Sequence, residues 1–220
     1  MVLSIKANSI SKQLIAFMFA LGVSMVYAFD LGDKLLNLIE EKYGPPARER
    51  LEIWQDIANS PATLSTTEKL NKVNQFFNKT HFKSDWQHWG KEDYWATPVE
   101  MLATNGGDCE DYSIAKYFTL KTMGISVEKL RITYVKAIRL NQAHMILAYY
   151  ETPGSEPLIL DNLVGDIRPA SKRPDLVPVY SFNGDGLWLS KQRGQGKKIG
   201  KSEKLTRWVD LNTRLLDGLK

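Results

Sequence analysis

The sequence predicts an α+β fold in which N-terminal helices pack on a mostly antiparallel sheet. Residues 30–123 carry apolar side chains at helical spacing, broken by Gly and Pro. Residues 130–190 instead form short alternating runs separated by turn signals. A last amphipathic stretch closes the chain, and the sequence contains no internal repeat. Helices followed by an antiparallel sheet are typical of the α+β class.

The N-terminus has the pattern of a secretory signal peptide. Two lysines precede an apolar run from Leu14 to Tyr27, and Val26-Tyr27-Ala28 fits a small-residue cleavage site. The run is shorter than the roughly 20 residues that span a bilayer, so we expect cleavage after Ala28 and no stable membrane insertion. Residues 1–28 are therefore the predicted signal peptide, and residues 29–220 form one exported, periplasmic domain.

The first part of that domain, residues 29–93, is predicted to be helical. The expected helices are Asp30–Tyr43, Ala47–Asn59 and a third that runs to Phe77 after the capping box Ser65-Thr66-Thr67-Glu68. An aromatic loop, Asp85–Gly90, follows and continues to Trp95.

The second part, residues 94–220, carries the candidate chemistry. Thr97-Pro98-Val99-Glu100 caps a short helix that Gly106-Gly107 ends, and a longer helix runs from Cys109 to Met123. The expected strands are Leu130–Ile138, Ala143–Glu151, Leu158–Leu163, Val177–Phe182 and Gly186–Ser190. Asn183-Gly184-Asp185-Gly186 predicts a hairpin between the last two. Lys191–Lys204 is basic and Gly-rich and is interpreted as a flexible loop, and Ser202–Leu216 as the final helix.

The charge balance excludes some classes of function. The chain has 29 basic and 25 acidic residues. Because the two numbers are nearly equal, the charge indicates no strong electrostatic partner. Nucleic-acid binding is not expected for an exported chain of this kind.

Cys109 is the only cysteine, so it cannot form an intramolecular disulfide. It begins a predicted helix, where backbone N–H groups and the macrodipole favour a thiolate. A free thiol in an exported protein is at risk of oxidation, which indicates a function for it. The alternative is a small buried apolar residue.

His144 and Asp161 complete a nucleophile–base–orienter order along the chain. His144 shares a predicted strand face with Ile146 and Ala148, and Asp161 shares one with Ile159. Adjacent antiparallel strands should set Asp161 beside His144, and we expect the Cys109 helix to pack across that same face. His81 and His88 precede the nucleophile and are poorer candidates for the base.

Three acids flank the candidate nucleophile, namely Asp108, Glu110 and Asp111. Like charges oppose ionisation of the thiol. Two interpretations remain open: the acids stabilise the helix N-terminus, or they bind a cation such as calcium, which favours carboxylate oxygens. The Cys109 backbone N–H is the expected oxyanion donor. Trp95 is a possible second donor or pocket residue, although a buried Trp is more often core.

Four segments together resemble the bacterial transglutaminase-like cysteine proteinases: Tyr94–Glu100, Gly106–Tyr112, Ala143-His144-Met145 and Leu160-Asp161-Asn162. The resemblance covers nearly the whole mature chain. It implies a papain-like, transglutaminase-like core with a Cys109–His144–Asp161 triad. It also implies calcium near the nucleophile, with Asp108 and Glu110 at matching positions and Asp111 as a further ligand.

The resemblance further implies the biological role. It predicts cleavage of large cell-surface adhesins near their N-termini at a double-alanine site, which releases the adhesin and disperses a biofilm. It also implies an inner-membrane receptor for cyclic di-GMP that sequesters the protease. The alternatives are transglutaminase-like acyl transfer, a cell-wall peptidase of the NlpC/P60 kind, and a non-enzymatic periplasmic calcium-binding interaction module.

Overall fold

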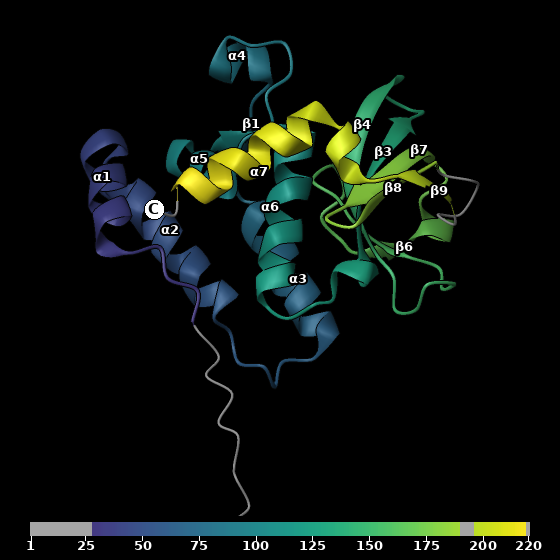
Figure 1. Cartoon of the computed structure of the whole chain (residues 1–220), viewed down its shortest axis with the longest axis horizontal. Helices are drawn as coiled ribbons and strands as arrows, with labels where there is room; N and C mark the ends of the chain where they lie inside the picture. Colours follow the sequence, from purple (N-terminus) through teal and green to yellow (C-terminus); the bar gives the residue numbers. More distant parts are fainter. Residues whose placement is uncertain (1–27, 190–195, 219–220) are drawn as a thin grey trace, which may run out of the picture.

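The computed structural model describes residues 28–189 and 196–218. Figure 1 shows a helical part beside a twisted sheet, with α6 between them. Helix α6 contacts α2, α3 and α5 on one side and strands β3 and β4 on the other. The α+β class is therefore confirmed. The predicted signal peptide lies almost wholly outside the described residues. Within them, no helix combines the length and apolar character needed to cross a bilayer.

The helices follow the predicted order. They are α1 (Asp33–Tyr43), α2 (Pro45–Ala58), α3 (Thr66–Phe77), α4 (Asp85–Trp89), α5 (Pro98–Thr104), α6 (Cys109–Thr122) and α7 (Thr206–Gly218), with short 3₁₀ turns at Val127–Lys129, Ala170–Lys172 and Ser202–Lys204. Both predicted capping boxes form, at Ser65 and Thr97. The predicted aromatic loop was wrong in part, because Asp85–Trp89 forms the short helix α4.

Within residues 28–189 and 196–218, the main sheet has seven strands in the order β6-β5-β4-β3-β7-β8-β9, and all pairs are antiparallel. The strands are β3 (Leu130–Ala137), β4 (Gln142–Tyr149), β5 (Leu158–Leu160), β6 (Arg168–Pro169), β7 (Leu176–Asn183), β8 (Gly186–Leu189) and β9 (Lys197–Gly200). A separate parallel pair joins β1 (His81–Phe82) to β2 (Gly106–Gly107).

Two predicted loops thus contain strands. Gly106-Gly107 ends α5 as expected but also pairs with β1. Lys197–Gly200 pairs with β8, although its lysines were interpreted as part of a flexible loop. Residues 191–195 of that loop lie outside the described residues. Lysines are common on edge strands because they discourage further pairing, so an apolar pattern could not reveal this one.

The two faces of the sheet belong to different apolar clusters. Met145, Leu147 and Tyr149 point into the large core with α6. Ile146, Ala148 and Ile159, together with Val135, form a second cluster on the opposite face. The expectation that the Cys109 helix packs across the face of Ile146 and Ala148 was therefore wrong. Strand β4 is buried on both faces from His144 onward, so its pattern could not show which face the helix covers.

Candidate active site

Cys109 is the first residue of α6, and the backbone before it is held by Asp111. The buried Asp111 carboxylate accepts hydrogen bonds from the backbone N–H groups of Ala96 and Asp108, at 2.7 and 3.2 Å. A Cβ on Gly107 would lie 2.8 Å from Asp111. The glycine is therefore needed so that the carboxylate can approach this backbone. Together these contacts set the position of the thiol.

The thiol lies against the beginning of β4. The backbone N–H of Met145, the residue after His144, is directed at the Cys109 sulfur. The thiol itself donates to Glu110 Oε2 at 3.0 Å. Burial raises the pKa of Cys109, and the negative charges of Glu110 and Asp108 raise it further, while the Met145 N–H lowers it. The thiol is therefore neutral while these acids are ionised and unpaired with a cation.

His144 and Asp161 lie side by side, as the strand order predicts. The distance from His144 Nε2 to Asp161 Oδ1 is 2.8 Å, and the two residues are only 3% and 1% exposed. With Nε2 engaged by Asp161, Nδ1 is the imidazole nitrogen left for proton exchange. Sequence reasoning thus placed this pair correctly. The triad role of Cys109, His144 and Asp161 stays a prediction.

Asp161 has further partners that the sequence did not indicate. Arg173 Nη2 lies 2.8 Å from Asp161 Oδ2, and the Leu163 N–H donates to Oδ1 at 3.0 Å. Burial alone would raise the pKa of Asp161. The hydrogen bond and charge of His144, the Leu163 N–H and Arg173 together hold it below its usual value. Asp161 is therefore ionised at neutral pH, as an orienting acid must be.

A buried lysine supports the same residue from the helix side. Lys116 donates to Asn78 Oδ1 at 2.7 Å, and Asn78 donates to the Asp161 backbone carbonyl at 2.8 Å. Lys116 is seven residues after Cys109, so both point to one face of α6. That spacing is the one sequence signal that could have found Lys116.

The acidic cluster is larger than predicted. Asp85, Asp108 and Asp111 form one group, and Asp85, Asp93 and Glu110 form a second. In each group the carboxylate oxygens lie within 4.8 Å of one another. Burial raises the pKa of Asp85 to about 6 and that of Asp108 to about 10, with a further contribution from Glu110. Asp85 and Asp93 were missed because they lie in the segment interpreted as an aromatic loop.

The cluster has the properties of a divalent cation site. Among the described residues, the buried oxygens Asp85 Oδ1 and Asp108 Oδ1 have no hydrogen-bond partner. Unpaired buried carboxylate oxygens are costly, and a hard cation with oxygen ligands would satisfy them. The residues present therefore fit such an ion.

Trp95 is part of the core. Its ring stacks on Phe182 at a centroid distance of 5.4 Å, and its indole N–H is bonded to Asp93. This contact gives the N–H a partner beside the acidic cluster. An oxyanion role for Trp95 therefore gains no support from the structure.

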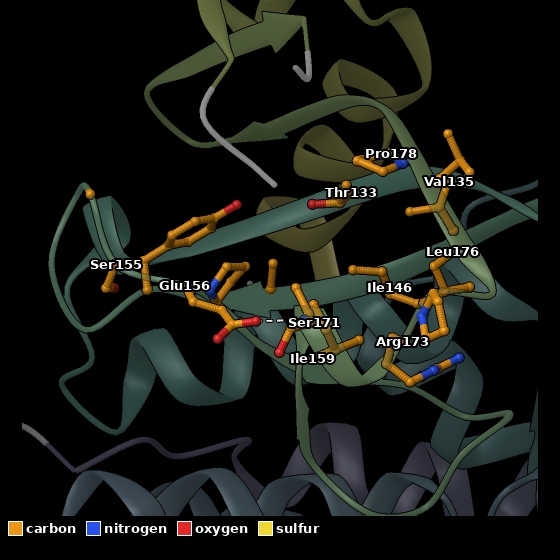
Figure 2. A pocket seen from close by; sticks show the side chains of 17 residues that line it. Thr133, Val135, Ile146, Ser155, Glu156, Ile159, Ser171, Arg173, Leu176 and Pro178 are labelled. Atoms are coloured by element: carbon orange, nitrogen blue, oxygen red, sulfur yellow. Dashed lines mark hydrogen bonds between the residues drawn. The ribbon is translucent and has the colours of Figure 1, made fainter. Parts of the chain in front are cut away.

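A groove of about 840 Å³ lies on the sheet face opposite α6. Figure 2 shows Ile146, Ile159 and Leu176 on its floor and walls, with Glu156 bonded to the Ser171 N–H. Arg173 lines one end, and its guanidinium points away from the centre of the groove (Figure 2). Arg173, which lies 2.8 Å from Asp161, therefore links the groove to the candidate triad.

Comparison with known proteins identifies the family. Residues 51–189 match the family described as bacterial transglutaminase-like cysteine proteinase BTLCP. This match spans more than half of the chain and includes Cys109, His144 and Asp161. The chain belongs to this proteinase family.

Solved structures of one member agree with the fold. Legionella pneumophila LapG treated with EGTA is 44% identical, with a TM-score of 0.74, and the alignment covers 85% of this chain and 98% of LapG. Calcium-bound Legionella pneumophila LapG is also 44% identical, with a TM-score of 0.72 and coverage of 85% and 99%. Curated protein sequences gave no match. The transglutaminase-like fold and the proteinase family are thus confirmed.

Proposed function

We propose that this chain is an exported, calcium-dependent cysteine endopeptidase. The observation that carries the proposal is the position of the lone thiol, at the N-terminus of α6 and next to strand β4. His144 lies on that strand, and its Nε2 is 2.8 Å from Asp161 Oδ1. Membership of the proteinase family supports the same activity.

The chemistry follows from the residue types. His144 accepts the thiol proton, and the Cys109 sulfur attacks the scissile carbonyl carbon to form the sulfur–carbon bond. The imidazolium then returns the proton to the leaving amine as the peptide bond breaks. His144 next deprotonates the water that hydrolyses the thioester. Asp161 holds the imidazole in the required tautomer, and the Cys109 backbone N–H faces the developing oxyanion.

Calcium is the proposed ion of the acidic cluster, with Asp108, Glu110 and Asp111 as ligands and Asp85 and Asp93 as further candidates. An all-carboxylate set suits this hard cation, and a relative, LapG, is described as calcium-bound. When bound, calcium supplies positive charge beside the nucleophile. Glu110, which otherwise accepts from the thiol, would then be engaged elsewhere.

The proposed substrate is a large cell-surface adhesin cut near its N-terminus at a double-alanine site. Its release would promote biofilm dispersal, and an inner-membrane cyclic di-GMP receptor of the LapD type would sequester the protease. The family resemblance and the 44% identity to LapG support this assignment. The signal-like N-terminus supports a periplasmic location. Mass-spectrometric reading of the mature N-terminus should find Phe29 first, whereas retention of residues 1–28 would contradict export with cleavage.

Cleavage of a matched substrate tests the activity. The probe is the recombinant N-terminal region of a large secreted protein that contains an Ala-Ala site and is encoded in the same genome. Wild type should cut it, and Cys109→Ala should abolish cutting while circular dichroism and the thermal melt stay unchanged. His144→Ala should do nearly as much harm. Ser202→Ala, remote in sequence, is the control. Equal cleavage by Cys109→Ala and wild type would overturn the proposal.

The same assay separates the alternatives. A primary-amine probe that becomes attached to the substrate without hydrolysis would indicate acyl transfer. Release of peptides from purified peptidoglycan would indicate a cell-wall peptidase. Calcium binding with no reaction of any substrate, and function that survives thiol blocking, would indicate an interaction module.

A further inference from the structure

A row of half-exposed side chains extends from the nucleophile across the sheet. We propose that Tyr134, Tyr180 and Leu189, which we call the apolar shelf, bind an apolar side chain of the polypeptide substrate a few residues from the scissile bond. This inference rests on the proposed endopeptidase function and adds a determinant of its specificity.

The strand register builds the shelf. Met145 on β4 is directly opposite Tyr134 on β3, Tyr134 is opposite Tyr180 on β7, and Tyr180 is opposite Leu189 on β8. Directly opposed residues of antiparallel strands project from the same face. Met145 belongs to the core on the α6 side, so the whole row lies on the face where α6 begins with Cys109. Because the Met145 N–H is directed at the Cys109 sulfur, the row starts at the nucleophile.

The shelf is preformed and accessible. The rings of Tyr134 and Tyr180 stack at 5.0 Å with an interplanar angle of 7°, and Tyr180 stacks in turn on Phe182. Both tyrosines are only partly buried, and Leu189 is 52% exposed. Within the described part of the chain, neither tyrosine hydroxyl makes a hydrogen bond. Rigid aromatic side chains with a free polar end bind polypeptides at low entropic cost.

The length of the row sets the position that it recognises. Three strand spacings of about 4.8 Å separate Met145 from Leu189, or about 14 Å in all. An extended peptide covers this in about four residues, at about 3.4 Å each. The shelf should therefore recognise a residue three to five positions from the scissile bond.

The surroundings of the shelf define what it rejects. Burial raises the pKa of Tyr180, the neighbouring Tyr134 and the charges of Asp93 and Glu110 raise it further, and Arg207 lowers it. Arg207 is already paired with Asp93 at 2.9 Å. Burying an ionised carboxylate against these rings costs hydration that an apolar side chain does not lose, so an acidic substrate side chain is disfavoured here relative to an apolar one.

The test is a panel of fluorogenic peptides with a central Ala-Ala bond and Leu or Asp at each of positions two to six on either side. Wild type should prefer Leu over Asp at one position three to five residues away, by about fivefold in kcat/KM. Leu189→Ala and Tyr180→Ala should remove most of this preference through KM. The rate at which iodoacetamide alkylates Cys109 should be unchanged, which shows an intact nucleophile.

Leu38→Ala on α1 is the matched control, because Leu38 is 56% exposed and lies in the helical part, away from the sheet. It should keep the wild-type profile. If Tyr180→Ala lowers the melting temperature, Leu189→Ala and Leu189→Lys at the exposed end of the row decide the question. Cleavage with no preference at these positions, or with a preference that is unchanged in the Leu189 variants, would contradict the proposed role of the shelf. The proposed endopeptidase activity would not be affected by that result. Failure of wild type to cut any peptide would count against the endopeptidase itself, and the shelf would fall with it.

Discussion

Asp161 illustrates how one buried carboxylate is kept charged. Its two oxygens are shared among His144, the Leu163 N–H and Arg173, and Arg173 is also bonded to Asp175 at 2.9 Å. Burying a charge is unfavourable unless it is paired and hydrogen-bonded. Arg173 is therefore a positioning residue for the proposed base rather than a catalytic group.

Replacing Arg173 with Met should lower kcat by roughly tenfold, because Asp161 then holds the imidazole less firmly. It should also move the acid limb of the pH–rate profile upward, since the pKa of Asp161 rises when a cation is removed. Arg173→Lys keeps the charge but loses the planar fork, so it should restore part of the activity. Arg168→Met, at a more exposed arginine, is the control.

The Arg173→Met variant should also change how the stability of the protein depends on pH. The lowered pKa of Asp161 means that its contribution is present above the ordinary carboxyl pKa of about 3.9 and is lost as the pH falls through the folded-state value. The gap in melting temperature between wild type and Arg173→Met should therefore be wide at pH 7 and narrow below about pH 4. An equal gap at both pH values, or an unshifted acid limb, would contradict this role.

Helix α6 depends on the glycine before it. Gly107→Ala should destabilise the protein by about 1–3 kcal/mol, because the new Cβ would lie 2.8 Å from Asp111 and displace its carboxylate. Since Asp111 holds the backbone beside Cys109, activity should fall as well. Gly165→Ala is the matched control, because nothing lies within 4 Å of its added Cβ. Thermal melts and the cleavage assay check both variants. Wild-type behaviour of Gly107→Ala would show that Asp111 adjusts without cost.

Lys116 of α6 also donates a hydrogen bond to Asn78, the residue that follows α3. Burial lowers the pKa of Lys116 to about 7, and the charge of Asp161 opposes this with a smaller effect. Between this value and the unfolded pKa of about 10.4, the unfolded chain binds more protons, so this group makes the protein more stable as the pH rises. Lys116→Met should remove that gain. Denaturant titrations should therefore show that the unfolding free energy of the variant falls further below that of wild type between pH 7 and pH 9.5. A constant difference in unfolding free energy would mean that Lys116 does not titrate in this range.

Four segments of the chain meet at the acidic cluster. Asp85 begins α4, Asp93 precedes α5, and Asp108, Glu110 and Asp111 surround the start of α6. Arg207 of α7 is bonded to Asp93 at 2.9 Å, so the C-terminal helix also reaches this region. A cation bound here would link the helical part to the nucleophile.

Chelation should therefore remove activity and lower the melting temperature together, and added calcium should restore both, because an ion that binds only the folded state stabilises it. Asp85→Asn and Asp93→Asn should weaken calcium binding in calorimetry and shift the recovery of activity to higher calcium. Asp166→Asn, an exposed aspartate outside the cluster, should match wild type. Full activity after exhaustive chelation would mean that the acids only stabilise the N-terminus of the helix and do not bind a required ion.

Local signals predicted much of this protein. The capping boxes at Ser65 and Thr97, the helix that begins at Cys109 and the hairpin at Asn183–Gly186 all formed where expected. These features depend on contacts within about four residues, so the sequence pattern contains them directly. The pairing of His144 with Asp161 followed from the same logic, since neighbouring antiparallel strands bring their facing residues together.

Other features depended on how distant segments pack. A strand buried on both sides, β4, carries no sign of which face meets α6. Arg173 lies 12 residues beyond Asp161, and Asp85 lies 23 residues before Asp108, and no periodicity links either pair. Asp161 and Arg173 come together because burying an unpaired charge costs more free energy than any local preference can offset. Asp85 and Asp108 repel each other, and each keeps an oxygen with no hydrogen-bond partner among the described residues, an arrangement that a bound cation would stabilise. Both approaches are made only when the helices close against the sheet.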